Sequence, residues 1–240
     1  MANSYFAFKQ FTVYHDKCAM KVGTDGVLLG AWADVKDTGR ILDVGAGSGL
    51  IALMLAQRSG ANIDAVEIEV DAYKQAGENL LASPWNDRIK VFNDSFQHFS
   101  DTTANRYDLV ISNPPYFRNS LKPPVNSRSL ARHDERLGYE SLLKGSKGIL
   151  TSSGRLAIII PAKETVRFTE LAYFEDLYPR RITWVRANQS KNYSRCLMEF
   201  STNRTQACIT GEMTIKQENN EEYSDEYVVL TREYYLMFDV

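Results

Sequence analysis

Asp43-Val44-Gly45-Ala46-Gly47-Ser48-Gly49 lies between a strand-like run, 40–44, and a helix-like run, 50–58. Glycine lets a chain turn sharply and approach a ligand closely, and the helix that follows offers unpaired N–H groups in its first turn. In an open parallel sheet, the ligand crevice lies at the carboxyl ends of the strands. The stretch therefore predicts an α/β fold whose ligand site lies at this turn.

Strands and helices alternate on both sides of the turn, which predicts a mostly parallel sheet with helices on both faces. Thr24 and Asp25 are predicted to cap a helix, 1–23 to form an N-terminal extension with a possible hairpin, and 24–240 to form the main domain. Predicted strands occupy 40–44, 62–68, 89–92, 107–112, 156–160, 182–185, 195–200 and 208–215, and predicted helices 50–58, 70–81, 139–147, 164–174 and 226–235. The last strands lack helical connectors, so we expect an antiparallel strand at that edge.

The composition is that of an ordinary globular protein, with 44% hydrophobic and 24% charged residues. No run approaches the ~20 apolar residues that span a bilayer, so we expect no membrane partner. Cys18, Cys196 and Cys208 fit neither a disulfide framework nor a zinc site, which favours a reducing cytoplasm and predicts no bound metal. The net charge of -2 argues weakly against a nucleic-acid partner, but 118–136 holds five Lys/Arg against two Asp/Glu, and 180–204 holds six against one. Such runs can form a basic face that attracts phosphates.

The spacing of the glycines separates two possible cofactors. A dinucleotide-binding turn, G-x-G-x-x-G, would need a third glycine at position 50, which is Leu50. The pattern here is D-x-G-x-G-x-G, and a carboxylate at Asp43 suits the cationic sulfonium and amino group of S-adenosylmethionine better than a pyrophosphate. Glu67, at the end of the next strand, is placed to accept from ribose hydroxyls. A tight turn without a ligand is the alternative. The predicted cofactor-binding residues of this turn and strand are Asp43, Gly45, Gly47, Gly49 and Glu67.

A second motif, Asn113-Pro114-Pro115-Tyr116, follows the predicted strand 107–112 directly. The amide oxygen of Asn113 and the carbonyl of Pro114 can accept both hydrogens of one amine. An adenine amine is a poor nucleophile because its lone pair is delocalised, and two acceptors would favour a pyramidal, reactive nitrogen and stabilise its developing charge. The ring of Tyr116 can stack on the base. A turn that merely ends the strand is the alternative.

D-x-G-x-G-x-G followed by N-P-P-Y resembles the class I methyltransferases that act on planar nitrogens. The segment 15–32, H-D-K-C-A-M-K-V-G-T-D-G-V-L-L-G-A-W, together with Ser83-Pro84-Trp85 and the closing 223–236, resembles the bacterial tRNA(Val) adenine-N6 methyltransferases. The resemblance implies a Rossmann-like sheet of seven strands with one antiparallel edge strand, S-adenosyl-L-methionine as cofactor, and N6-methylation of an adenosine in the anticodon loop of a tRNA. A flipped or loop-exposed adenine suits such a site.

The resemblance also implies roles for individual residues. Thr24 and Asp25 would border the methionine half of the cofactor, Asp94 would accept from its adenine amine, and Asn113 would contact cofactor as well as substrate. For Asp94, a turn-forming role is the alternative, and His15 is predicted to be a local structural contact. The basic loop after Tyr116 is expected to bind RNA phosphates through Arg118, Lys122, Arg128 and Arg132.

Several other functions stay open at this point. They are a protein-glutamine methyltransferase acting on a release factor, a DNA adenine or ribosomal guanine-N2 methyltransferase, a non-catalytic S-adenosylmethionine-binding module and an NAD-dependent oxidoreductase. Asn113 and Tyr116 argue against the module, and Leu50 argues against the oxidoreductase. We expect the enzyme to be a monomer.

Overall fold

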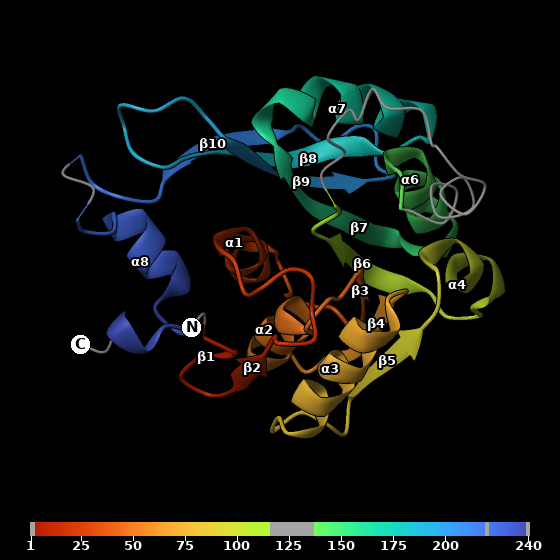
Figure 1. Cartoon of the computed structure of the whole chain (residues 1–240). Helices are drawn as coiled ribbons and strands as arrows, with labels where there is room; N and C mark the ends of the chain where they lie inside the picture. The colour runs from red at the N-terminus through yellow and green to blue at the C-terminus, as the bar shows by residue number, and fades with distance from the viewer. Residues whose placement is uncertain (1–2, 116–136, 219–220, 239–240) are drawn as a thin grey trace, which may run out of the picture.

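The computed structural model describes residues 3–115, 137–218 and 221–238. Its centre is an eight-stranded sheet with the strand order β10-β8-β9-β7-β6-β3-β4-β5, and helices lie on both of its faces (Figure 1). The strands are β3 (Arg40–Val44), β4 (Asn62–Glu67), β5 (Ile89–Asn93), β6 (Tyr107–Ser112), β7 (Leu150–Pro161), β8 (Tyr178–Arg186), β9 (Arg195–Ser201) and β10 (Ile209–Thr214). The Rossmann-like class predicted from the sequence is confirmed.

The expected seven strands with an antiparallel strand at the edge are wrong in two details. The sheet has eight strands, and its one antiparallel strand, β9, lies inside it, between β7 and β8. β8 and β9 form a hairpin, and β9 fills the space next to β7. β10 then pairs with the outer side of β8 in the parallel direction, so the edge strand is parallel.

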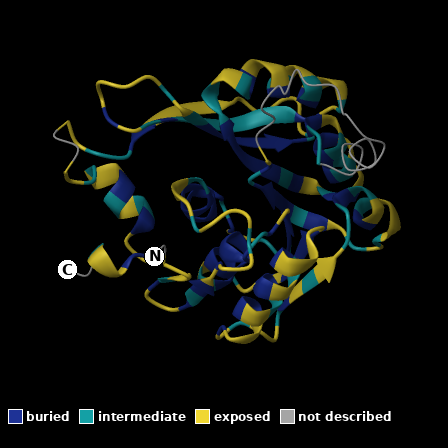
Figure 2. Ribbon diagram, viewed as in Figure 1, coloured by how far each residue is buried: buried dark blue, intermediate teal, exposed yellow. Residues whose placement is uncertain are grey.

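The helices form two layers that bury alternate residues of the strands. α1 (Thr24–Trp32), α2 (Leu50–Arg58), α3 (Val70–Leu81) and α8 (Asp225–Thr231) lie on one side, and α4 (Phe96–Thr102), α6 (Tyr139–Ile149) and α7 (Thr165–Phe174) lie on the other. Within β3, Ile41 packs into the first layer and Leu42 into the second. The central strands are therefore buried on both faces, as Figure 2 shows, and read as continuous apolar runs. No helix in the described ranges has the length and apolarity that a membrane crossing requires.

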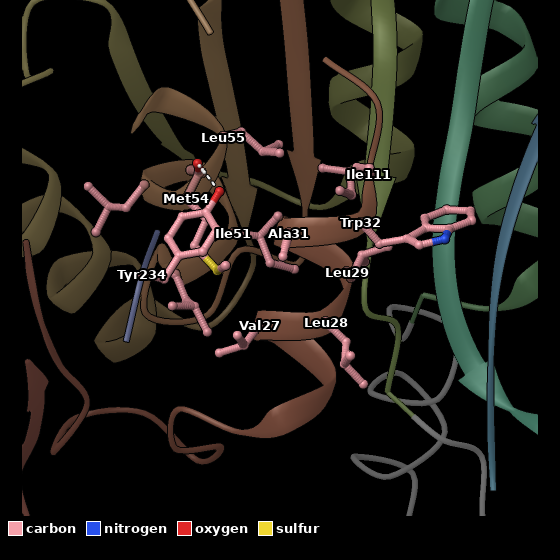
Figure 3. Packing of buried hydrophobic residues seen from close by; sticks show 14 of the residues in the cluster. Val27, Leu28, Leu29, Ala31, Trp32, Ile51, Met54, Leu55, Ile111 and Tyr234 are labelled. Carbon is pink, nitrogen blue, oxygen red and sulfur yellow. Dashed lines mark hydrogen bonds between the residues drawn. The ribbon is translucent and has the colours of Figure 1, made fainter. Parts of the chain in front are cut away.

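The first layer is centred on α1, which is apolar around its whole circumference. Val27, Leu28 and Leu29 belong to one buried cluster with residues of α2 and the sheet, and Figure 3 shows them projecting from different sides of α1. The hydroxyl of Tyr234 donates to the Met54 carbonyl at 3.1 Å. A Cβ at Gly30 would lie 2.8 Å from the sulfur of Met54, so a larger residue there would force the Met54 side chain on α2 to shift. The start of α1 differs from the prediction, because Gly23 is the N-cap and no side chain caps the helix.

The two ends of the chain pack together. β1 (Tyr5–Ala7) pairs antiparallel with β2 (Thr12–Tyr14) in a separate two-stranded sheet, and the N–H of Lys9 donates to the Tyr234 carbonyl at 2.9 Å. The ring of Tyr235 contacts Phe6 and Phe8 of the hairpin. Figure 1 shows the hairpin beside the last helical segment, η2 (Leu236–Phe238). A second 3-10 segment, η1 (Ala162–Glu164), follows β7.

Candidate functional site

Four neighbouring strands end in register at one edge of the sheet. Ser112 of β6 pairs with Val44 of β3, and Val44 pairs with Val66 of β4. Glu67 of β4 pairs with Asn93 of β5. The residues that follow the strand ends therefore stand side by side, with Asn113 next to the glycine turn, then Glu67 and then Asp94, at strand spacings of about 4.8 Å.

The glycine turn has a left-handed backbone that other residues rarely adopt. Gly45, Gly47 and Gly49 have φ angles of 72°, 56° and 80°. The N–H groups of Gly45 and Ala46 donate to the Val66 carbonyl at 2.9 and 3.1 Å, which fixes the turn to β4. Within the described part of the chain, a Cβ on Gly45 or Gly47 would meet no atom within 4 Å. These two glycines therefore leave a smooth backbone surface against which a ligand can lie.

Glu67 is a structural partner of the turn as well as a candidate ligand. Its side chain is buried, and its two carboxylate oxygens accept from the N–H groups of Gly47 at 2.8 Å and Glu69 at 2.9 Å. A carboxylate oxygen has a second lone pair, so both oxygens can still accept from ribose hydroxyls. The two backbone bonds hold the carboxylate in one orientation before any ligand arrives.

Asp43 is a buried carboxylate, 1% exposed. The N–H of Ala52, in the first turn of α2, donates to it at 3.1 Å. Its pKa is raised to about 7, mainly because burial opposes its charge; the hydrogen bond from Ala52 lowers the pKa, and the charge of Glu67 raises it. A cation placed beside Asp43 would stabilise its charged form, so the position suits a positively charged ligand.

Both oxygens of Asp94 have partners in the protein. Oδ1 accepts from the N–H of Ser95 at 2.7 Å, and Oδ2 lies 2.7 Å from Nδ1 of His98. This hydrogen bond raises the pKa of His98. Asp94 is therefore bonded locally to Ser95 and His98, and its contact with an adenine stays a prediction. Ile68, which the sequence analysis did not select, is 41% exposed at the end of β4 and offers an apolar surface at this edge.

The Asn-Pro-Pro motif begins where β6 is tied to β3. The hydroxyl of Ser112, fully buried, donates to the Val44 carbonyl at 2.9 Å. Asn113 is half-buried, Pro114 is buried and Pro115 is exposed. The remaining residues predicted for catalysis and RNA binding, Tyr116, Arg118, Lys122, Arg128 and Arg132, lie outside the described residues.

Thr24 and Asp25 lie at the start of α1. Thr24 is exposed, and a carboxylate oxygen of Asp25 accepts from Nε of Arg195 at 2.8 Å. Arg195 is the first residue of β9 and pairs with Pro161, the last residue of β7. The ion pair thus joins α1 to the edge of the sheet that carries Asn113, and contact of either residue with the cofactor stays a prediction.

Asn79 is a residue of the site that the sequence analysis missed. Its buried amide donates to the carbonyls of Ser48 at 2.9 Å and Tyr14 at 2.8 Å and accepts from the Tyr14 N–H at 3.0 Å. One side chain therefore ties the glycine turn to the N-terminal hairpin. Asn79 lies one helical turn after Gln75 on the buried face of α3, and two amides on a buried face were the available signal.

His15 is a structural contact, as predicted. The ring is 5% exposed. Its Nε2 lies 2.9 Å from the Asn3 carbonyl, and the N–H of Val22 donates to its Nδ1 at 3.4 Å. Across 3–115, 137–218 and 221–238, no three His, Cys, Asp or Glu side chains are arranged as a metal site requires.

Comparison with known protein families shows which family has this arrangement of residues. The model of the methyltransferase small domain matches residues 19–178. The chain belongs to the methyltransferase small-domain family. The match includes the glycine turn, Glu67 and the Asn-Pro-Pro motif.

Several relatives that match this chain over nearly its full length are named tRNA1(Val) (adenine(37)-N6)-methyltransferase. The protein of this name from Bacteroides thetaiotaomicron is 49% identical over 238 residues, which make up 98% of this chain and 99% of the relative. The one from Trichodesmium erythraeum is 43% identical over 241 residues, 99% of this chain and 100% of the relative.

Solved structures share the fold of this methyltransferase at low sequence identity. A predicted O-methyltransferase from Agrobacterium tumefaciens has a TM-score of 0.67 at 18% identity, covering 88% of this chain and 96% of that one. A 16S rRNA N2 G1207 methyltransferase from T. thermophilus has a TM-score of 0.57 at 16% identity, covering 83% of this chain and 50% of that one. At these identities, the likeness shows the fold alone.

Proposed function

We propose that this protein is an S-adenosylmethionine-dependent tRNA methyltransferase that methylates N6 of adenine 37 in tRNA1(Val). Relatives of that printed name match it at 43–49% identity over nearly the full length of both chains, which favours RNA over a release-factor glutamine as the substrate. The structural observation that carries the proposal is the pairing of Val44 with Ser112. It brings the glycine turn and the Asn-Pro-Pro motif to adjacent strand ends.

The residues at the glycine turn fit S-adenosyl-L-methionine, the cofactor of this enzyme. The pKa of the buried Asp43 carboxyl lies at about 7, so a cationic neighbour would stabilise its ionised form. Gly45 and Gly47 leave the backbone of the turn open to a ligand, because they carry no side chain. Glu67, held by two backbone N–H groups, accepts from the ribose hydroxyls. When bound, the cofactor supplies an electrophilic methyl group on a sulfonium centre.

The Asn-Pro-Pro motif prepares the nucleophile. The Asn113 amide oxygen and the Pro114 carbonyl accept the two hydrogens of the adenine amine, which turns the nitrogen lone pair out of conjugation and toward the methyl group. As the nitrogen took the methyl group and the S–C bond of the sulfonium broke, positive charge would develop on nitrogen, and the two acceptors would stabilise this charge until one N–H proton was lost to water. The fixed backbone of two consecutive prolines keeps the acceptors in place.

The remaining parts of the proposal are predictions from the sequence or from the proposed substrate. Stacking of Tyr116 on the adenine and phosphate binding by the loop after it are predictions for residues outside the described ranges. A cytoplasmic location follows from the proposed substrate, because tRNA is modified there. The monomeric state also stays a prediction.

The test is an assay with labelled S-adenosylmethionine and total tRNA from a strain that lacks this gene. We expect label in N6-methyladenosine after nucleoside digestion, and much less label with tRNA from the parent strain, where the position is already methylated. Label in a release factor instead, or no label in tRNA, would contradict the proposed function.

A further inference from the structure

The sheet continues past the candidate site for four more strands, in the order β7, β9, β8 and β10. At the edge that carries Asn113, each of these strands begins or ends close to a cation. Arg195 begins β9, Arg186 ends β8, Lys163 lies in η1 after β7, Lys191 lies in the loop 187–194 between β8 and β9, and Lys216 lies just after β10. We call these five residues the strand-end row. With strand spacings of about 4.8 Å, the row spans about 14 Å, a length along which an RNA strand carries several phosphates.

Two of the acidic groups near the row are bound to its arginines, whereas Glu164 directly follows Lys163, and Glu218, Asp225 and Glu226 line the pocket beside Lys216. Asp25 is paired with Arg195 at 2.8 Å, and Glu212 lies 3.8 Å from Arg186. The lysines differ, because neither Lys163 nor Lys191 has an ion-pair partner among the described residues, and both are exposed. Two exposed lysines without a direct ion pair therefore stand on this surface, next to arginines that are held by their own ion pairs.

Two aromatic rings lie next to Arg186. The guanidinium of Arg186 is 5.4 Å from the ring centre of Tyr193, and the rings of Tyr193 and Trp184 are 5.9 Å apart. Both rings are only partly buried. Rings next to cations suit single-stranded nucleic acid, because bases stack on the rings while phosphates meet the charges.

Hydrogen bonds within the loop hold the segment that carries Lys191 and Tyr193. The buried side chain of Asn188 accepts from the N–H of Ser190 at 3.1 Å and from its hydroxyl at 2.8 Å, and the N–H of Lys191 donates to the Asn188 carbonyl at 3.1 Å. The N–H of Ala162, beside Lys163, donates to the Ser194 carbonyl at 3.1 Å. Lys163 and the loop are thus held as one surface, and little conformational entropy is lost when a strand binds.

We propose that the strand-end row binds the RNA strand that flanks the target adenine, with phosphates on Lys163 and Lys191 and a base on Tyr193. The inference rests on the proposed function and identifies a docking surface for its substrate. It places this part of the substrate on β7–β10 (Figure 1), on the side of Asn113 away from the cofactor turn.

The experiment compares two double variants and one aromatic variant. Lys163→Ala/Lys191→Ala should raise the Kd for unmodified tRNA about tenfold and reduce the slope of log K against log salt by about 1.4, the contribution of two phosphate contacts on a single strand. Tyr193→Ala should weaken binding while leaving that slope unchanged. The control is Lys36→Ala/Arg106→Ala, which removes two exposed cations at the opposite edge of the sheet.

S-adenosylmethionine affinity and melting temperature are measured for every variant. Both quantities should match the wild type in the two double variants. If wild-type protein binds and methylates tRNA but Lys163→Ala/Lys191→Ala keeps its affinity and salt slope, the docking surface is wrong and the proposed function stands. If the wild type neither binds nor methylates tRNA, the proposed function fails, and the inference fails with it.

Discussion

Among single residues, Asp43 at the glycine turn makes the stability of the protein depend on pH. Its folded-state pKa of about 7 lies above the ordinary value of 3.8, because burial opposes its charge. Between these two values the folded protein holds a proton that the unfolded chain has lost. The contribution of Asp43 to stability therefore falls as the pH rises through this window and is level above it.

The same carboxyl predicts the pH dependence of cofactor binding. A cationic ligand prefers the ionised carboxylate, so affinity for S-adenosylmethionine should rise with pH and be about tenfold weaker at pH 6 than at pH 8. Calorimetric titration in buffers of different ionisation enthalpy should show proton release on binding at pH 6.5. Asp43→Asn is the matched variant, and its affinity should be weak and flat. A wild-type affinity that does not vary between pH 6 and pH 8 would show that Asp43 is not the partner of the cation.

The residues of the glycine turn could be predicted from the sequence because they lie close together along the chain. Asp43, the three glycines and Glu67 lie within one strand–helix–strand unit, whose chemistry can be read from the order of residues. The partners of Asp94 also lie nearby, at Ser95 and His98, but side-chain direction is not visible in the sequence. Asn79 bonds to Ser48, which is 31 positions away in the sequence, and to Tyr14, which is 65 positions away. Only the folded chain therefore reveals its role.

Among the elements, α3 holds the glycine turn and the N-terminal hairpin together through Asn79. Asn79→Ala would leave the Ser48 and Tyr14 backbone groups without their partner, at a cost of about 2 kcal/mol in the free energy of unfolding. Because the Ser48 carbonyl belongs to the turn, affinity for S-adenosylmethionine should fall as well. Chemical denaturation and ligand titration measure the two effects.

The control for Asn79 is Asn86→Ala. Asn86 is exposed, and its amide donates to the Leu81 and Ser83 carbonyls at 3.3 Å in a surface turn. Cofactor affinity should be unchanged in this variant. Equal losses of affinity in Asn79→Ala and Asn86→Ala would show that the link between α3 and the turn has no specific effect.

Elements were predictable where a continuous apolar run marked a buried strand, and α4 was missed because only Phe96 and Phe99 of its residues are buried. The parallel strands of the first half are apolar runs, and their ends agree with the sequence prediction within a residue or two. α4 also has only seven residues, although Ser95 caps it by accepting from the His98 N–H at 3.1 Å. The interior position of β9 was also missed, since strand order depends on pairing between segments far apart in the chain.

In the whole molecule, the two chain ends close one side of the first helical layer. The ring of Tyr235 is 8% exposed and lies between the hairpin rings Phe6 and Phe8 and the C-terminal ring of Phe238. Its hydroxyl lies 3.2 Å from that of Tyr227 on α8. The hairpin also contacts α3 through Asn79, so the chain ends connect indirectly to the cofactor turn.

Tyr235→Ala should therefore destabilise the protein by about 3 kcal/mol, as removal of a buried aromatic ring does. Amide hydrogen exchange in 5–14 should be faster than in the wild type, while exchange in the central strands should change less. Tyr173→Ala is the control, because that ring is 50% exposed on α7 and its loss should change stability little. Unchanged exchange in the hairpin of Tyr235→Ala would show that the two ends are stabilised independently.

The central claim is that Asn113, beside the cofactor turn, activates the N6 amine of adenine 37. The most direct measurement is the single-turnover rate of N6-methyladenosine formation at position 37 of unmodified tRNA1(Val), for wild type, Asn113→Ala and Asn113→Asp. We predict methylation at that position by the wild type and, at saturating S-adenosylmethionine, a rate at least a hundredfold lower for Asn113→Ala, because a lost acceptor costs about 3 kcal/mol in the transition state. Asn113→Asp should keep partial activity. A folded Asn113→Ala protein with a wild-type rate, or methylation at another atom or position, would contradict the account.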